Sequence, residues 1–153
     1  MIPVPLPKGS FTSAPIAAAA LRAPPPGPAG DIVRRVNDFR AEHGLHALSW
    51  NDQLAAAAAA HARDLDQSGT FGHDGSRGET LSERLRAAGY RLCFAAENLA
   101  DGFRTPQQVV SGWRGSLKHR TNMLAPQANS AGAALSNLNG RPVWVLNVGA
   151  GCF

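Results

Sequence analysis

Residues 51–69 read NDQLAAAAAAHARDLDQSG and carry the strongest local structure signal in the chain. Asn51 belongs to the residue types that cap helix N-termini through a side-chain oxygen. Alanine has the highest helix propensity, and Ala55–Ala60 are six alanines in a row. Gly69 then supplies a residue that easily takes the left-handed conformation in which helices end. These signals predict a helix that begins after Asn51 and stops at Gly69.

Three further helices are indicated on either side of this segment. One is predicted over 31–43, with its first residue as the cap and apolar residues at helical spacing. A shorter one is predicted over 81–89. The last begins at Thr105, with Pro106 in the first helical position and Gln108 at the capping-box spacing.

The end of the chain changes from helical to alternating periodicity. Ala131–Asn137 and Pro142–Val148 are predicted strands, and Asn137–Gly140 is a turn that joins them as a hairpin. Four helices around a small antiparallel sheet predict a layered α+β domain.

The composition indicates one globular domain. The chain has 153 residues, of which 44% are hydrophobic and 17% charged. The net charge of +4 comes from 15 basic and 11 acidic residues, and no basic run interrupts their mixture. No uncharged apolar run approaches the roughly 18 residues that cross a bilayer. We therefore expect no nucleic-acid partner and no transmembrane segment.

Residues 1–30 differ from the rest, since they hold 8 of the 11 prolines and no acid. Ala14–Leu21 is a short apolar block preceded by Lys8, an order typical of a signal peptide. A signal peptide or its remnant, a disordered Pro/Ala tail, and sequence upstream of the true start codon all stay open. In each case a flexible linker is expected up to Gly30, with the folded domain over 31–153.

The chain lacks the common catalytic signatures: it has no glycine-rich phosphate loop, His-Glu-x-x-His, Cys-x-x-Cys or Gly-x-Ser-x-Gly. The candidate residues for binding or catalysis are therefore His73, Glu97 and His119, which are widely spaced along the chain. Two imidazoles with carboxylates bind Zn²⁺ or act as an acid–base pair. Histidines satisfied by neighbouring hydrogen bonds are the alternative reading, and spacing alone does not decide between them.

Several short motifs follow one another along the chain in an order that is typical of a known family. They are Trp50 with His61-Ala62, His73, Arg84, Ala88-Gly89-Tyr90, Ala96-Glu97-Asn98-Leu99-Ala100, and Trp113-x-x-Ser116-x-x-His119-Arg120-x-Asn122-Met123-Leu124. Together they resemble the CAP superfamily of cysteine-rich secretory, antigen 5 and pathogenesis-related 1 proteins, also called SCP domains. The short bacterial members resemble this chain in particular, over about residues 31–153.

The resemblance implies a three-layer α-β-α sandwich with a small antiparallel sheet and a cleft lined by two histidines and two acids. His73 and His119 match the family's imidazoles and are the implied metal ligands, and Glu97 matches one acid. Glu83 fits the second acid, and Glu79 is the alternative. Acids facing these imidazoles are expected to raise the pKa values of both histidines.

Other residues near these motifs are expected to support the cleft. Asn98 and Asn122 are predicted to hold backbone groups, and Arg120 either pairs with an acid or covers the rim. The family usually has glycine where this chain has Lys118, which adds a positive charge that weakens divalent-metal binding or favours an anionic partner. His61, on the alanine-rich helix, is predicted to be a packed structural residue.

Cys93 and Cys152 are the only cysteines. Because the family is largely secreted, we expect them to form a disulfide, with two buried free thiols of a cytosolic protein as the alternative. The resemblance implies a secreted or periplasmic monomer whose cleft binds a small-molecule, lipid or peptide ligand, or Zn²⁺ or another divalent cation, without established turnover. A zinc-dependent hydrolase or peptidase using the same cleft, and a sterol- or lipid-binding protein, are the alternatives.

Overall fold

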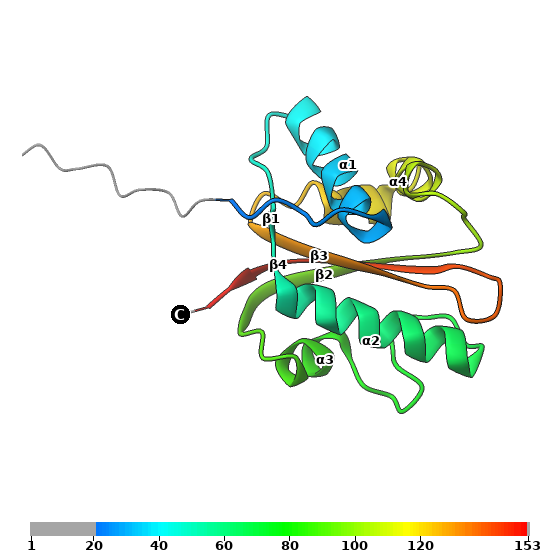
Figure 1. Cartoon of the computed structure of the whole chain (residues 1–153). Helices are drawn as coiled ribbons and strands as arrows, with labels where there is room; N and C mark the ends of the chain where they lie inside the picture. The colour runs from blue at the N-terminus through cyan, green and yellow to red at the C-terminus, as the bar shows by residue number, and fades with distance from the viewer. Residues whose placement is uncertain (1–20, 153) are drawn as a thin grey trace, which may run out of the picture.

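A computed structural model gives the fold of residues 21–152. Five helices and four strands follow one another along the chain as α1 (Pro28–Glu42), β1 (Ser49–Trp50), α2 (Asp52–Ser68), α3 (Leu81–Ala87), β2 (Leu92–Asp101), α4 (Pro106–Arg114), α5 (Leu117–Met123), β3 (Ser130–Ser136) and β4 (Val143–Gly151). Helices α1 and α4 cover one face of the sheet, and α2 and α3 cover the other (Figure 1). The predicted three-layer α+β architecture is confirmed.

The four strands lie in the order β1-β3-β4-β2. β3 pairs antiparallel with β4 as the predicted hairpin, and β4 pairs antiparallel with β2. The two-residue β1 runs parallel to β3, so the sheet is mixed rather than wholly antiparallel. β2 therefore occupies one outer edge of the sheet, where only one side of the strand is paired.

Local capping signals explain the ends of α2 and α4. The side chain of Asn51 accepts a hydrogen bond from the Leu54 N–H, and Gly69 adopts φ +70° at the other end of α2. Thr105 accepts from the Gln108 N–H, while the Gln108 side chain accepts from the Arg104 N–H, one residue ahead of the cap. Both predicted limits of α2 and the predicted start of α4 are confirmed.

Helix α1 begins earlier than predicted. Gly27 is its N-cap and Pro28 its first residue, whereas Asp31, the predicted cap, lies in the first turn and pairs with Arg34. Proline suits this start because its fixed φ is already helical and it has no N–H to satisfy. The Arg34 guanidinium also donates to the carbonyls of Pro24 and Pro25, so the expected boundary at residue 30 falls inside a packed helix. The signal-peptide prediction concerns residues that lie almost entirely outside 21–152.

Helix α5 (Leu117–Met123), which contains Lys118, His119 and Arg120, is a fifth helix in addition to the four that the sequence predicts. Ser116 is its N-cap but makes no side-chain capping hydrogen bond, so the usual start signal is missing. The buried Arg40 of α1 donates instead to the carbonyls of Met123 and Ala125, where α5 ends. Contacts with the rest of the fold thus hold this helix.

The core lies on both faces of the sheet. Val143 and Val145 of β4 pack against Ala58 and Leu65 of α2 on one face, and intervening residues such as Trp144 pack toward α1 and α4 on the other. Each of the three tryptophan N–H groups has an acceptor, namely the Asp52 carboxylate for Trp50, the Leu99 carbonyl for Trp113 and the Phe103 carbonyl for Trp144. The core therefore leaves no indole unsatisfied.

The alanine run of α2 also has a packing role. A Cβ atom on Gly132 of β3 would overlap the backbone of Ala55, so the helix lies directly on the strand. Small residues on both elements allow that close approach. Within residues 21–152, no helix combines the length and the hydrophobicity needed to cross a membrane.

Candidate functional site

The residues that carry the predicted chemistry meet in a cleft at the outer edge of β2. A cavity of about 280 Å³ is lined by His73, Leu81, Ala96, Glu97, Lys118, His119 and Asn122. His73 and Leu81 come from the layer that contains α2 and α3, whereas Lys118, His119 and Asn122 come from α5. Residues from the two helical layers thus line the same cleft, one layer on each side of the β2 edge.

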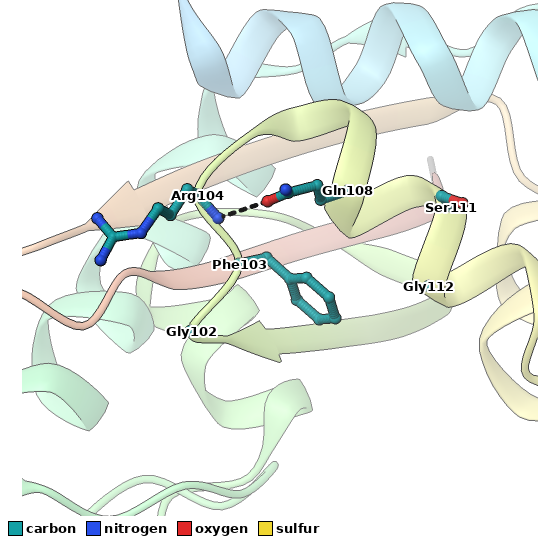
Figure 2. Close-up of a pocket in the computed structure, with 6 residues that line it drawn as sticks. All are labelled: Gly102, Phe103, Arg104, Gln108, Ser111 and Gly112. Atoms are coloured by element: carbon teal, nitrogen blue, oxygen red, sulfur yellow. Dashed lines mark hydrogen bonds between the residues drawn. The ribbon is translucent and has the colours of Figure 1, made fainter.

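One larger hollow lacks the residues that the predicted chemistry needs. The hollow beside α4, of about 620 Å³, is lined by Gly102, Phe103, Arg104, Gln108, Ser111 and Gly112. Figure 2 shows the Phe103 ring alongside the helix and the Gln108 side chain bonded to the backbone of Arg104. No acid, histidine or cysteine lines it, so we take the cleft at β2 as the candidate site.

Glu97 is the buried centre of the cleft. Its Oε1 lies 3.0 Å from His73 Nδ1 and its Oε2 lies 2.7 Å from an Arg84 guanidinium nitrogen, with the Glu97 side chain 2% exposed. The ring of His73 donates its Nδ1–H to this carboxylate, so the neutral ring carries its lone pair on Nε2. His73 is 55% exposed, which leaves that second nitrogen for a ligand.

Arg84 is a site residue whose role the sequence does not predict. Besides Glu97, its guanidinium donates to the backbone carbonyl of His73 at 2.6 Å. One buried side chain thus fixes both the carboxylate and the backbone of its histidine partner. The only sequence signal was its position before Ala88-Gly89-Tyr90, since ion pairs between separate elements leave no spacing pattern.

His61 lies beneath the cleft as a neutral buried residue. Its Nε2 donates to the Gly72 carbonyl at 2.9 Å and lies 3.8 Å from Glu97 Oε1. Burial, helped by the charge of Arg84, lowers the pKa of His61, against the opposing charge of Glu97. The bond to Gly72 fixes the loop immediately before His73.

Two asparagines attach α5 to β2. Asn98 donates its side-chain amide to the His119 carbonyl at 3.1 Å, and Asn122 donates to the Asn98 side chain at 2.9 Å and to the Glu97 carbonyl at 3.3 Å. This chain of amide contacts positions His119 beside the strand edge. Both asparagines hold backbone oxygens, as the sequence analysis expects.

The electrostatic surroundings of His119 differ from the expected ones. Burial, followed by the positive charges of His73 and Lys118, lowers the pKa of His119. The expectation that acids would raise it is wrong for this histidine, because Glu97 is already paired with Arg84 and His73. The imidazole of His119 is therefore neutral at neutral pH.

The remaining predicted site residues lie outside the cleft lining. Glu83 accepts a hydrogen bond from the Thr80 hydroxyl at the first turn of α3 and is exposed. The Glu79 side chain lies over Gly75. Arg120 donates to the Arg114 carbonyl at 3.0 Å and has no acidic partner within residues 21–152. The structure thus brings together both imidazoles and Glu97 but places neither Glu83 nor Glu79 with them.

The donor set falls short of a complete zinc site. Catalytic zinc uses three protein ligands and structural zinc four. His73 and His119 offer two nitrogens, while both oxygens of Glu97 already have partners. Among residues 21–152, no group of three or more His, Cys, Asp or Glu side chains is arranged to hold a metal ion. The residues of the cleft do not fit a resident zinc ion.

The expected disulfide is confirmed between Cys93 and Cys152, whose Cα atoms are 5.0 Å apart. It joins the start of β2 to the residue after β4, next to a hydrogen bond from the Cys152 N–H to the Arg91 carbonyl. Closing a loop with a sequence separation of 59 residues stabilises the fold by about 4 kcal/mol in the chain-entropy model.

Comparison with known proteins gives consistent matches. The family model described as "CAP: Cysteine-rich secretory protein family" matches residues 33–148. The uncharacterized protein YkwD of Bacillus subtilis is 30% identical over 101 residues, which are 66% of this chain and 39% of that protein. An extracellular SCP-domain protein from Bacillus anthracis has a TM-score of 0.76 at 28% identity, covering 80% of this chain and 40% of that one.

A further solved structure shows the same fold at lower identity. An outer surface protein from Borrelia burgdorferi has a TM-score of 0.74 at 20% identity, covering 79% of this chain and 90% of that one. The chain spans about two fifths of the length of the two Bacillus proteins, at 39% and 40%.

Proposed function

This chain belongs to the cysteine-rich secretory protein (CAP) family, and we propose that its cleft at the edge of β2 binds a ligand that carries a carboxylate or similar anionic group. One observation carries the proposal. The acid of the cleft, Glu97, is engaged by Arg84 and His73, so the titratable groups that still face the cavity are two imidazole rings and the Lys118 ammonium, with no free carboxylate among them.

Three side chains supply the recognition. His73 offers Nε2, His119 offers its ring, and Lys118 adds an ammonium group that forms no ion pair within residues 21–152. A charge-assisted hydrogen bond from the Lys118 ammonium to a carboxylate is short and strong. A neutral imidazole also takes up a proton more readily when an anion lies beside it, which strengthens the interaction further.

A divalent cation is the second candidate ligand, and one observation favours it. Histidines that bind metals commonly donate the other ring N–H to a carboxylate, as His73 does to Glu97. Against this candidate stand the two-nitrogen donor set and the charge of Lys118. The proposal contains no catalytic step, so hydrolase and lipid-binding activities lie outside it.

We infer export from the cell together with this function. The Cys93–Cys152 disulfide supports it, because such bonds persist in oxidising compartments. The Bacillus anthracis relative is described as extracellular, which agrees with that inference. Free thiols in protein isolated from the medium or periplasm would contradict the disulfide, and finding the protein only in the cytoplasm would contradict export.

The test of the proposed function follows the imidazole ¹⁵N resonances of the full chain labelled at histidine. Sodium acetate, at constant ionic strength, should shift the ring nitrogens of His73 and His119 and leave those of exposed His43 unchanged. Lys118→Gln should weaken acetate binding by up to about fivefold, the effect of one exposed charge. Zinc chloride is the comparison. If zinc shifts both rings and acetate shifts neither, the cation replaces the anion as the ligand, and if neither ligand shifts them the proposal fails.

A further inference from the structure

We propose that the ligand of this cleft is the C-terminal end of an extended peptide, which adds as a parallel strand to the outer edge of β2 at Ala95 and Glu97. The inference rests on the proposed function and specifies its ligand class. Three features of the strand edge carry it: the direction of its backbone groups, the part of it that is covered, and the charges beside it.

The hydrogen bonds of β2 show which backbone groups point outward. The Glu97 carbonyl accepts from Asn122 and the Leu99 carbonyl accepts from Trp113, so both carbonyls point away from β4. In an antiparallel ladder, the N–H and C=O of one residue point to the same side, and the side alternates along the strand. The Glu97 N–H and both backbone groups of Ala95 therefore also point away from β4.

The register on the far side of β4 agrees with this assignment. Ala95 lies opposite Gly149, and the Gly149 carbonyl accepts from the Asn129 N–H, on the side of β4 away from β2. Within residues 21–152, the Ala95 N–H, the Ala95 carbonyl and the Glu97 N–H have no hydrogen-bond partner.

Only the first half of this edge is accessible. Trp113 of α4 and Asn122 of α5 cover the edge at Leu99 and Glu97, and residues 97–100 are buried. Cys93 is exposed, and residues 94–96 are half-buried. Ala96 and Glu97 line the cavity, so the accessible edge opens directly into the cleft. An added strand lies about 4.8 Å from its neighbour, in the plane of the sheet. That position lies between the walls formed by His73 and by α5.

The occupied Glu97 carbonyl determines where an added strand must stop. Asn122 already donates to that carbonyl, so no N–H of a ligand can bond there. A parallel strand avoids the occupied carbonyl if its C-terminal residue is the one that bonds to the Ala95 carbonyl, because no later N–H then faces Glu97. The terminal N–H donates to the Ala95 carbonyl, the terminal carboxylate accepts from the Glu97 N–H, and the carbonyl two residues earlier accepts from the Ala95 N–H.

The charges of the cleft favour this orientation over the reverse. A parallel peptide places its terminal carboxylate beside Lys118 and His119. An antiparallel peptide would bring its N-terminal ammonium to the same place, against the positive charge of Lys118. Main-chain pairing gives affinity at such an edge, and the side chains that point to either wall give specificity.

The test uses the pentapeptide acetyl-Val-Thr-Val-Thr-Val as the free acid, with the full ¹⁵N-labelled chain. The free acid should shift the Ala95 and Glu97 amide resonances and the His119 ring, and its C-terminal amide should bind at least about tenfold more weakly. N-methylation of the terminal residue removes the N–H that faces Ala95 and should weaken binding about tenfold. N-methylation of the penultimate residue removes an N–H that faces solvent and serves as the matched control, with binding kept within about threefold.

A variant of the protein gives a second readout. Ala95→Pro deletes an edge N–H without touching the β2–β4 ladder and should weaken binding of the peptide. Ala95→Ser retains that N–H and should bind the peptide as the unchanged chain does. Equal binding of acid and amide, equal effects of the two N-methyl groups, or no shift at millimolar peptide would each overturn the inference. If acetate binds but the free-acid peptide is not preferred, the proposed function stands and only the peptide inference fails. If neither acetate nor the peptide binds, both the proposed function and the peptide inference fail.

Discussion

The ion pair between Arg84 and Glu97 should be strongly coupled, so that removing both partners costs less than the two single changes added together. The side chains are 8% and 2% exposed, and the closest nitrogen–oxygen distance is 2.7 Å. Removing one partner of such a buried pair costs about 3–5 kcal/mol, because the other charge is left buried without compensation. Arg84→Met should lie at the upper end, since it also loses the hydrogen bond to the His73 carbonyl. Glu97→Leu should lie nearer 3 kcal/mol.

The double variant Arg84→Met/Glu97→Leu leaves neither charge unpaired. Its unfolding free energy should therefore be no lower than that of the less stable single variant, which corresponds to a coupling of about 3 kcal/mol. Urea denaturation at pH 7, followed by tryptophan fluorescence, measures the four proteins with their m-values. Additivity within about 0.5 kcal/mol would refute the reasoning, because it would mean that the two groups do not stabilise one another.

Three other outcomes are expected. The unfolding free energy should fall as the pH is lowered below about 6.5, because burial lowers the pKa of His61 in the folded chain and the unfolded chain takes up the proton first; a flat profile in urea denaturation between pH 8 and 5 would contradict this. Lys118→Ala should raise the pKa of His119 toward its ordinary value, and an unchanged NMR titration would show that the lysine charge does not act on the ring. Reducing the Cys93–Cys152 disulfide should lower the unfolding free energy by about 4 kcal/mol, which denaturation with and without a thiol reductant measures.

The sequence was informative wherever short-range interactions decide the structure. Helix α2 shows this most directly, because Asn51, the alanine run and Gly69 each act within a turn of their own position. The hairpin of β3 and β4 was predictable for the same reason, since alternation and a turn are local patterns. The parallel pairing of β1 lay beyond such patterns, because its partner β3 is separated from it by four helices and a strand.

Elements held by distant residues were harder to read. Helix α5 lacks a capping hydrogen bond and is attached instead through Asn98 and Asn122. β2 places the polar residues Glu97 and Asn98 in the middle of a buried strand, which breaks the alternation that identifies strands. Both departures lie at the cleft, where side chains serve the site as well as the core. The resemblance to a family supplied His73, Glu97 and His119, whereas the pairing of Glu97 with Arg84 required the fold.

The uneven cover of the β2 edge also bears on how the protein behaves when it is crowded with copies of itself. Bare edge strands are the usual starting points of β-aggregation, because they offer a row of backbone groups to another chain. Here Trp113 and Asn122 occupy the carbonyls of the second half, and an irregularity between Leu92 and Phe94 interrupts the first. The stretch left between them is long enough for the end of one peptide but too short to seed a continuous sheet. The same few residues that admit a ligand should therefore keep concentrated solutions of the protein free of fibrils.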